Sequence, residues 1–60
     1  MPADQILMEA RKLRRVSDSL DILAERDAPI SKELSLISGS VRNLAVVLEN
    51  LVALWLGRGH

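Results

Sequence analysis

The sequence predicts an all-α protein, an antiparallel two-helix hairpin that assembles into a four-helix bundle or a larger helical oligomer. Three observations support this prediction. Apolar residues recur at helical spacing in both halves of the 60-residue chain. One short proline-containing segment, residues 27–29, separates the two halves. The second half is also apolar on nearly every side, so a single neighbouring helix would leave much of it uncovered.

The first predicted helix covers about residues 3–26. Its apolar residues return with the period of a helix and not of a strand; they are Ile6, Leu13, Val16, Leu20 and Leu23, with Ala10 and Ala24 beside them. Asp4 lies in the first turn, where an acidic side chain favours a helix N-terminus. Ala28 precedes a proline, which disfavours helical geometry, so we expect the helix to end near residue 26.

The second predicted helix covers about residues 30–56. Its apolar series alternates spacings of three and four without a break, through Leu34, Ile37, Val41, Leu44, Leu48, Leu51 and Trp55. Pro29 fits the first turn of this helix, and Ser31 is an alternative N-cap. Gly57 fits a left-handed C-cap, so we expect residues 57–60 to form a disordered tail that includes His60.

An alternative divides the second helix at Ser38-Gly39-Ser40, because glycine inside a helix costs nearly 1 kcal/mol relative to alanine. The apolar series keeps its phase through this segment, from Ile37 to Val41. A real break would have no reason to preserve that phase. The sequence therefore favours one continuous helix.

Two helices of about 36 and 40 Å, at 1.5 Å per residue, joined by a connection of a few residues form an antiparallel hairpin. We expect residues 1–60 to be one helical-hairpin domain. The predicted register places large apolar residues opposite one another along its length: Leu23 opposite Leu34, Leu20 opposite Ile37, Val16 opposite Val41 and Leu13 opposite Leu44.

The C-terminal half indicates self-association. Between Leu44 and Leu56 only Glu49 and Asn50 are polar. Small chains without disulfides or metals are commonly stabilised by oligomerisation. We therefore expect a homodimer or a higher oligomer with the second helix at its centre. The predicted interface comprises Gly39, Leu44, Val46, Val47, Leu48, Leu51, Val52, Leu54 and Trp55. A larger protein partner would use the same surface.

The composition argues against catalysis. The chain has no cysteine and a single histidine, His60, so it lacks the residues of a disulfide framework, a thiolate metal site or a nucleophilic triad. We expect no enzymatic activity, cofactor or metal. The absence of cysteine and of a basic N-terminal segment fits a cytoplasmic location. We expect no membrane span, because the apolar run of 13 residues is shorter than the roughly 20 required and is preceded by Arg42 and Asn43.

A second hypothesis is a dimeric helical-hairpin regulator that binds nucleic acid. Arg11, Lys12, Arg14 and Arg15 form the densest basic cluster, and such patches bind phosphate backbones. The layout resembles that of small dimeric helical hairpins that bind RNA, although no sequence motif is shared. Against this hypothesis, the chain has zero net charge and no aromatic residue near the cluster, and Asp18 is spaced to pair with Arg14. We therefore favour the interaction module and do not expect a nucleic-acid partner.

Several polar residues invite a functional interpretation. Asp18, Asp21 and Glu25 share the outer face of the first helix, where we expect a solvated surface. Glu9 occupies an apolar-series position, from which it is expected to point outward or to pair with a basic residue of another subunit.

The serines around Gly39 predict a waist at which the helix backbones approach closely. Ser17 and Ser19 lie at the same level of the predicted hairpin as Ser38 and Ser40. Gly39 is predicted to admit a neighbouring helix of another subunit at this level.

Overall fold

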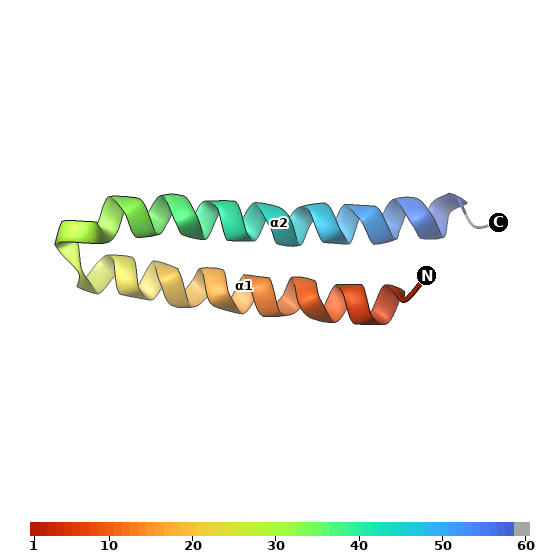
Figure 1. Cartoon of the computed structure of the whole chain (residues 1–60), viewed down its shortest axis with the longest axis horizontal. Coiled ribbons are helices and arrows are strands. Elements are labelled where there is room, and N and C mark those ends of the chain that lie inside the picture. Colours follow the sequence, from red (N-terminus) through yellow and green to blue (C-terminus); the bar gives the residue numbers. More distant parts are fainter. Residues whose placement is uncertain (59–60) are drawn as a thin grey trace.

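The computed structural model describes residues 1–58 as two long helices joined by a tight turn (Figure 1). Helix α1 spans Ala3–Arg26, the 3-10 turn η1 spans Ala28–Ile30, and helix α2 spans Ser31–Arg58. The two helices run antiparallel and side by side over an extent of 50 × 15 × 10 Å. The predicted all-α hairpin is confirmed, as is the continuity of the second helix through Gly39.

The break between the helices is at Asp27, directly after the predicted end of the first helix at residue 26. Asp27 has φ −114° and ψ 77°, and its N–H still donates to the Leu23 carbonyl at 3.0 Å. The N–H of Ile30 then donates to the Asp27 carbonyl at 3.0 Å and closes the turn. Pro29 lies within η1, near the start of the new helical segment, where its missing N–H removes no helical hydrogen bond.

The C-terminal end of α2 differs from the prediction. Gly57 and Arg58 are helical, and no glycine of the described part of the chain has a positive φ, so Gly57 is not a left-handed cap. The prediction of a tail is therefore wrong for residues 57 and 58. Residues 59 and 60, including His60, lie outside the described residues. Arg58 lies in the last turn, where a cation favours the helix C-terminus.

The side chains buried between the helices are small, which corrects the predicted core. They recur every seven residues and form what we call the small-residue seam: Ala10, Ser17 and Ala24 on α1, with Ser38, Ala45 and Val52 on α2. The large residues predicted to meet across the hairpin lie beside this seam. Four of them, Val16, Leu23, Ile37 and Leu44, are 43–55% exposed.

Close approach of the backbones explains why small residues occupy the seam. The Ser17 hydroxyl oxygen lies 3.1 Å from the Ser38 carbonyl oxygen, and the Ser38 hydroxyl oxygen lies 2.9 Å from the Ser17 carbonyl oxygen. A side chain as short as serine reaches the facing backbone only when the helices are close, and a leucine would hold them apart. This pairing also differs by two residues from the predicted register, which placed Ser17 opposite Ser40. The predicted waist is therefore inside the hairpin, between Ser17 and Ser38.

Helix geometry divides the remaining surface into two sides. Each residue turns the helix by about 100°. The residues three and six positions after a seam residue therefore lie on one side of the seam, and the residue four positions after it lies on the other side. On both helices the first set is apolar except near the helix ends, for example Leu20 after Ser17 and Val41 after Ser38. The second set is charged in the central turns, at Arg14, Asp21, Arg42 and Glu49. The hairpin thus has an apolar face and a polar side.

Candidate functional site

The apolar face is the largest feature without a partner within the hairpin. It comprises Ile6, Leu13, Val16, Leu20 and Leu23 of α1 and Leu34, Ile37, Val41, Leu44, Leu48, Leu51 and Trp55 of α2, all half-buried or exposed. It extends along both helices and carries most of the apolar series identified in the sequence. Its residues are large and uncharged, and all are aliphatic except Trp55. The buried cores of homodimer interfaces are apolar in the same way.

The hairpin alone buries very little apolar surface. Its fully buried apolar residues are Ala10, Ala24, Ala45 and Val52, which are 0–5% exposed. Val52 is the only valine, leucine, isoleucine, methionine or tryptophan among the described residues that is fully buried. Burial of a leucine-sized side chain contributes about 1.5–3 kcal/mol, whereas an alanine contributes far less. The apolar face therefore holds most of the hydrophobic stabilisation that this sequence can supply.

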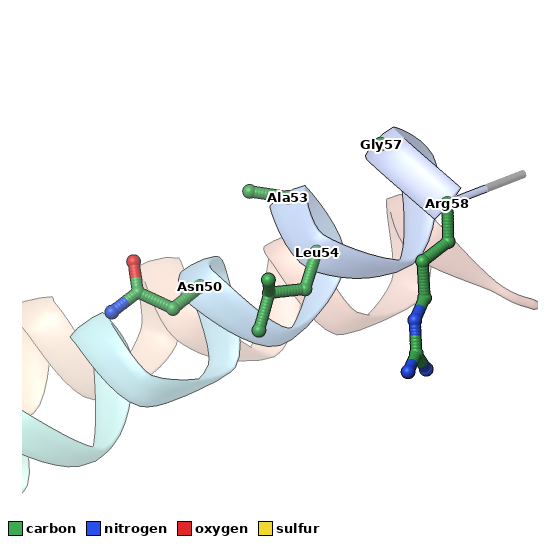
Figure 2. A pocket seen from close by; sticks show the side chains of 5 residues that line it. All are labelled: Asn50, Ala53, Leu54, Gly57 and Arg58. Carbon is green, nitrogen blue, oxygen red and sulfur yellow. The ribbon is translucent and has the colours of Figure 1, made fainter.

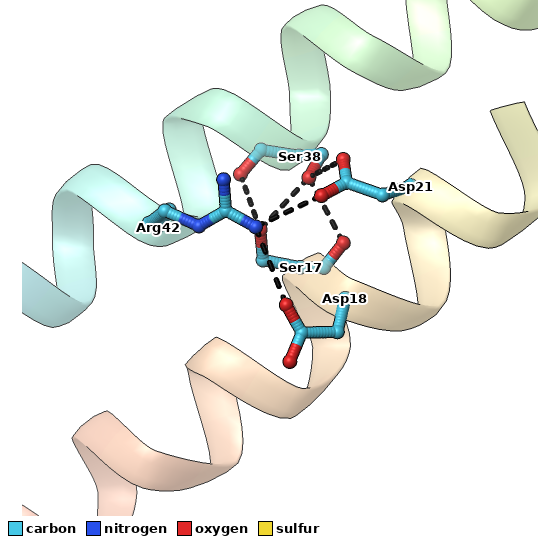
Figure 3. A network of polar contacts seen from close by, with 5 residues as sticks. All are labelled: Ser17, Asp18, Asp21, Ser38 and Arg42. Carbon is cyan, nitrogen blue, oxygen red and sulfur yellow. Dashed lines mark hydrogen bonds and ion pairs between the residues drawn. The ribbon is translucent and has the colours of Figure 1, made fainter.

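The polar side contains a connected network centred on the buried serine pair (Figure 3). Ser17 Oγ lies 2.8 Å from Ser38 Oγ, and Ser38 Oγ lies 2.5 Å from Asp21 Oδ1. Each hydroxyl has one proton to donate. Donation from Ser17 to Ser38 and from Ser38 to the Asp21 carboxylate uses each proton once and gives the charged acceptor the stronger hydrogen bond.

Ion pairs between the helices complete the polar side. Arg42 on α2 donates to Asp21 at 2.8 Å and to Asp18 at 3.3 Å (Figure 3). One heptad away on each helix, Arg14 on α1 makes a two-bond pair with Glu49 on α2, at 2.9 and 2.7 Å. These side chains are partly exposed, so solvent screens the pairs and their main effect is on register.

The same contacts shift the ionisation of the polar side. The hydrogen bond from Ser38, followed by that from Arg42, lowers the pKa of the Asp21 carboxyl group below its ordinary value. The hydrogen bond from Arg14 lowers the pKa of Glu49, and Glu49 in turn raises the pKa of Arg14. Both carboxylates are therefore ionised throughout the neutral range, which makes them poor candidates for general acids.

The basic cluster is divided by the fold. Arg14 is engaged by Glu49, and Lys12 pairs with Glu9 at 2.9 Å within α1. Arg11 and Arg15 are exposed on α1 away from α2. Two of the four predicted nucleic-acid contacts thus already have carboxylate partners in the hairpin, which reduces the positive charge that the cluster presents.

The predicted interface residues fall into three groups. Leu44, Leu48, Leu51 and Trp55 lie on the apolar face. Val52 is buried against α1, so it has no surface left to offer a second copy. The others lie on the remaining surface of α2: Gly39 and Val46 beside the polar side, and Val47 and Leu54 on the back.

A shallow open pocket of about 660 Å³ is present at the C-terminal end of α2 (Figure 2). It is lined by Asn50, Ala53, Leu54, Gly57 and Arg58, all from one helix. A hollow between side chains of a single exposed helix does not enclose a ligand. Within residues 1–58 no group of three or more histidine, cysteine, aspartate or glutamate side chains could hold a metal ion.

The stretch Ala28–Arg58 is long and apolar enough to cross a membrane by length and composition, with a mean hydropathy of 1.3 in its most apolar window. Only 17% of that window is buried in the hairpin. The high exposure has the same origin as the apolar face: α1 covers one narrow strip of α2 and leaves the rest open. No protein-family model, curated protein or solved structure in our comparisons matches this chain.

Proposed function

We propose that the chain is a non-catalytic self-association module in which the apolar face of one hairpin packs on the apolar face of a second copy. The observation that supports it is the mismatch between the small-residue seam and the apolar face. A hairpin stabilised only by the seam would leave its large apolar side chains in water. A second copy offers an apolar surface of the same length and the same composition.

The size of the face fits this occupant. The hairpin exposes 4646 Å² of accessible surface, and the ~800 Å² that each partner buries in a standard stable interface is about a sixth of it. The charged residues of the polar side are directed away from this surface. They would remain in solvent in a face-to-face dimer, so the ion pairs between the two helices would not have to be desolvated there.

Two other arrangements have less support. In a membrane-spanning arrangement Arg42 and Glu49 would enter the bilayer with their α1 partners, which is costly for charged groups. A nucleic-acid-binding regulator would rely chiefly on Arg11 and Arg15, since Lys12 and Arg14 are paired. A mobility-shift assay at low salt tests the second possibility, and we expect no shift with duplex DNA or structured RNA.

Sedimentation equilibrium of the unmodified protein, checked by light scattering, tests the proposal. We expect a mass of two or more chains, with dissociation and loss of helical circular dichroism occurring together on dilution. A helical monomer that persists at micromolar concentration would contradict self-association. It would assign the apolar face to a different protein.

A further inference from the structure

We infer that two copies stack face to face around a two-fold axis that places their turns at opposite ends of the four-helix bundle. This inference rests on the self-association proposed above and specifies its geometry. A two-fold interface repeats every contact twice. Two stackings satisfy this condition. With the turns at the same end, α1 of each copy covers α2 of the other. With the turns at opposite ends, α2 packs on α2 and α1 packs on α1.

The unequal length of the helices favours the opposite-end stacking. Helix α2 has 28 residues and α1 has 24, and α2 extends past the start of α1 (Figure 1). Trp55 lies in this overhang and is 49% exposed, while Ile30 in the turn is 50% exposed. Same-end stacking leaves both overhangs together with no α1 to cover them. Opposite-end stacking brings Trp55 of each copy onto the turn of the other.

The spacing of apolar residues along α2 is compatible with this antiparallel pairing. From Ile30 to Trp55 the series alternates steps of four and three that read the same from either end. A two-fold axis between Val41 and Leu44 therefore pairs every member with another member of the series: Ile30 with Trp55, Leu34 with Leu51, Ile37 with Leu48, and Val41 with Leu44. The axis falls near the middle of α2, so the α2 parts of the two faces overlap along their full length.

Glu9 supplies an independent argument. It lies six positions after Ala3, which places it on the side of the apolar face, and it pairs with Lys12 at 2.9 Å. Same-end stacking would set Glu9 against α2 of the second copy, which has no lysine or arginine between residues 43 and 57. Opposite-end stacking sets α1 on α1 and, by the same two-fold axis, places Glu9 level with Val16 of the second copy, within about one turn of that copy's Arg15 and Lys12. That arrangement gives Glu9 basic neighbours on the facing helix, whereas the facing segment of α2 in the same-end arrangement is uncharged apart from Glu49.

Disulfide trapping tests the geometry cleanly, because the chain contains no cysteine of its own. We would mix an Ile30→Cys chain with a Trp55→Cys chain in a glutathione redox buffer and separate the products by mass. A disulfide requires Cα atoms about 4.4–6.8 Å apart. Same-end stacking separates positions 30 and 55 of the two copies by about 37 Å along the bundle, at 1.5 Å per residue.

We expect the disulfide between the two different chains to form in excess of the fraction that random pairing of the chains would give. Two homodisulfides in place of it would overturn the opposite-end geometry, and a dimer that forms no disulfide would overturn the register. Because Trp55→Cys removes the overhang's anchor, we would repeat the test with Ile37→Cys and Leu48→Cys, for which the same product is expected. Leu36→Cys mixed with Leu48→Cys is the matched control and should give no excess, since Leu36 lies outside the apolar face.

Light scattering on the mixtures under reducing conditions distinguishes failure of the proposed self-association from failure of the proposed geometry. Monomers in the mixtures and in the unmodified protein would contradict the proposed function itself. Dimers that yield homodisulfides would leave self-association intact and contradict only the opposite-end geometry.

Discussion

The two sides of the hairpin follow different physical rules. On the polar side and in the seam, each group has a specific partner: Ser17 has Ser38, Asp21 has Arg42, and Arg14 has Glu49. On the apolar face, the contacts are large and chemically interchangeable, and none is completed within the chain. Directional bonds between small or charged groups fix how the helices align, whereas non-directional apolar area supplies the drive to associate. Under the proposed association, this hairpin places alignment of the helices on one side and association on the other.

The largest expected effect comes from placing a charge on the apolar face. Leu44→Glu should abolish association, because burying an uncompensated carboxylate costs about 3 kcal/mol or more, equivalent to a 100-fold or greater rise in Kd. Leu36→Glu is the matched control on the same helix. Leu36 is 66% exposed and lies outside the apolar face, so this variant should associate normally. Sedimentation of both variants checks the contrast, and equal loss in both would show that association does not depend on the apolar face.

The second effect tests the seam. Ala45 is fully buried between the helices, so Ala45→Leu should lower the free energy of unfolding by about 1–3 kcal/mol through overpacking. Ala53→Leu makes the same change at an exposed position of α2 and should alter stability by less than about 0.5 kcal/mol. Thermal melts at matched protein concentration measure the difference. A tolerated Ala45→Leu would mean that the helices are not in close contact at this level.

The third effect tests the ion pairs of the polar side by pH. Folding lowers the pKa of Asp21 and Glu49, so each contributes stability that is fully present above its ordinary value, 3.8 or 4.5. That contribution is lost as the pH falls through the lowered values. We expect the melting temperature to decrease in acid, and to decrease less steeply in the Asp21→Asn/Glu49→Gln variant. If the melting temperatures of the unmodified protein and the variant decreased equally in acid, Asp21 and Glu49 would not be the source of this stability.

The smallest effect concerns Gly39. A Cβ atom built at this position meets no atom within 4 Å, so the hairpin provides no packing reason for glycine. Gly39→Ala should therefore raise stability by nearly 1 kcal/mol through helix propensity alone. The position also lies outside the apolar face, so the oligomeric state should not change. A lowered melting temperature, or a weaker oligomer, would support the prediction that Gly39 admits another subunit.

The sequence was sufficient to predict the two helices. It was not sufficient to predict which strip of each helix packs against the other helix of the same chain. Helical periodicity located α1 at its observed bounds and α2 within two residues. The seam was missed because hydrophobicity alone assigns the largest apolar residues to the hairpin's own core. Leu44 and Leu51 carry the strongest hydrophobic signal, but that signal does not say whether the helix that covers them belongs to the same chain.

Two weaker signals would have located the seam. Serine or alanine recurs every seven residues on both helices, at Ala10 and Ser17 and at Ser38 and Ala45. Opposite charges follow four residues later, in the order that an antiparallel register needs for Arg14 to meet Glu49 and for Asp21 to meet Arg42. Short polar side chains contribute little to a hydrophobicity pattern, so such evidence becomes visible only when the two helices are compared residue by residue.

Under the proposed association, the small-residue seam makes the folding of this protein in a cell depend on its concentration. Among the apolar residues of positions 1–58, three alanines and Val52 are the ones fully buried, so a solitary hairpin has little apolar burial to stabilise it. Under the proposed association, folding and assembly therefore become a single step. The folded fraction then depends on how much of the chain is present. Freshly made chains at low abundance would be unfolded and open to proteases, while accumulation would protect them. Expression level itself would act as the switch between turnover and persistence.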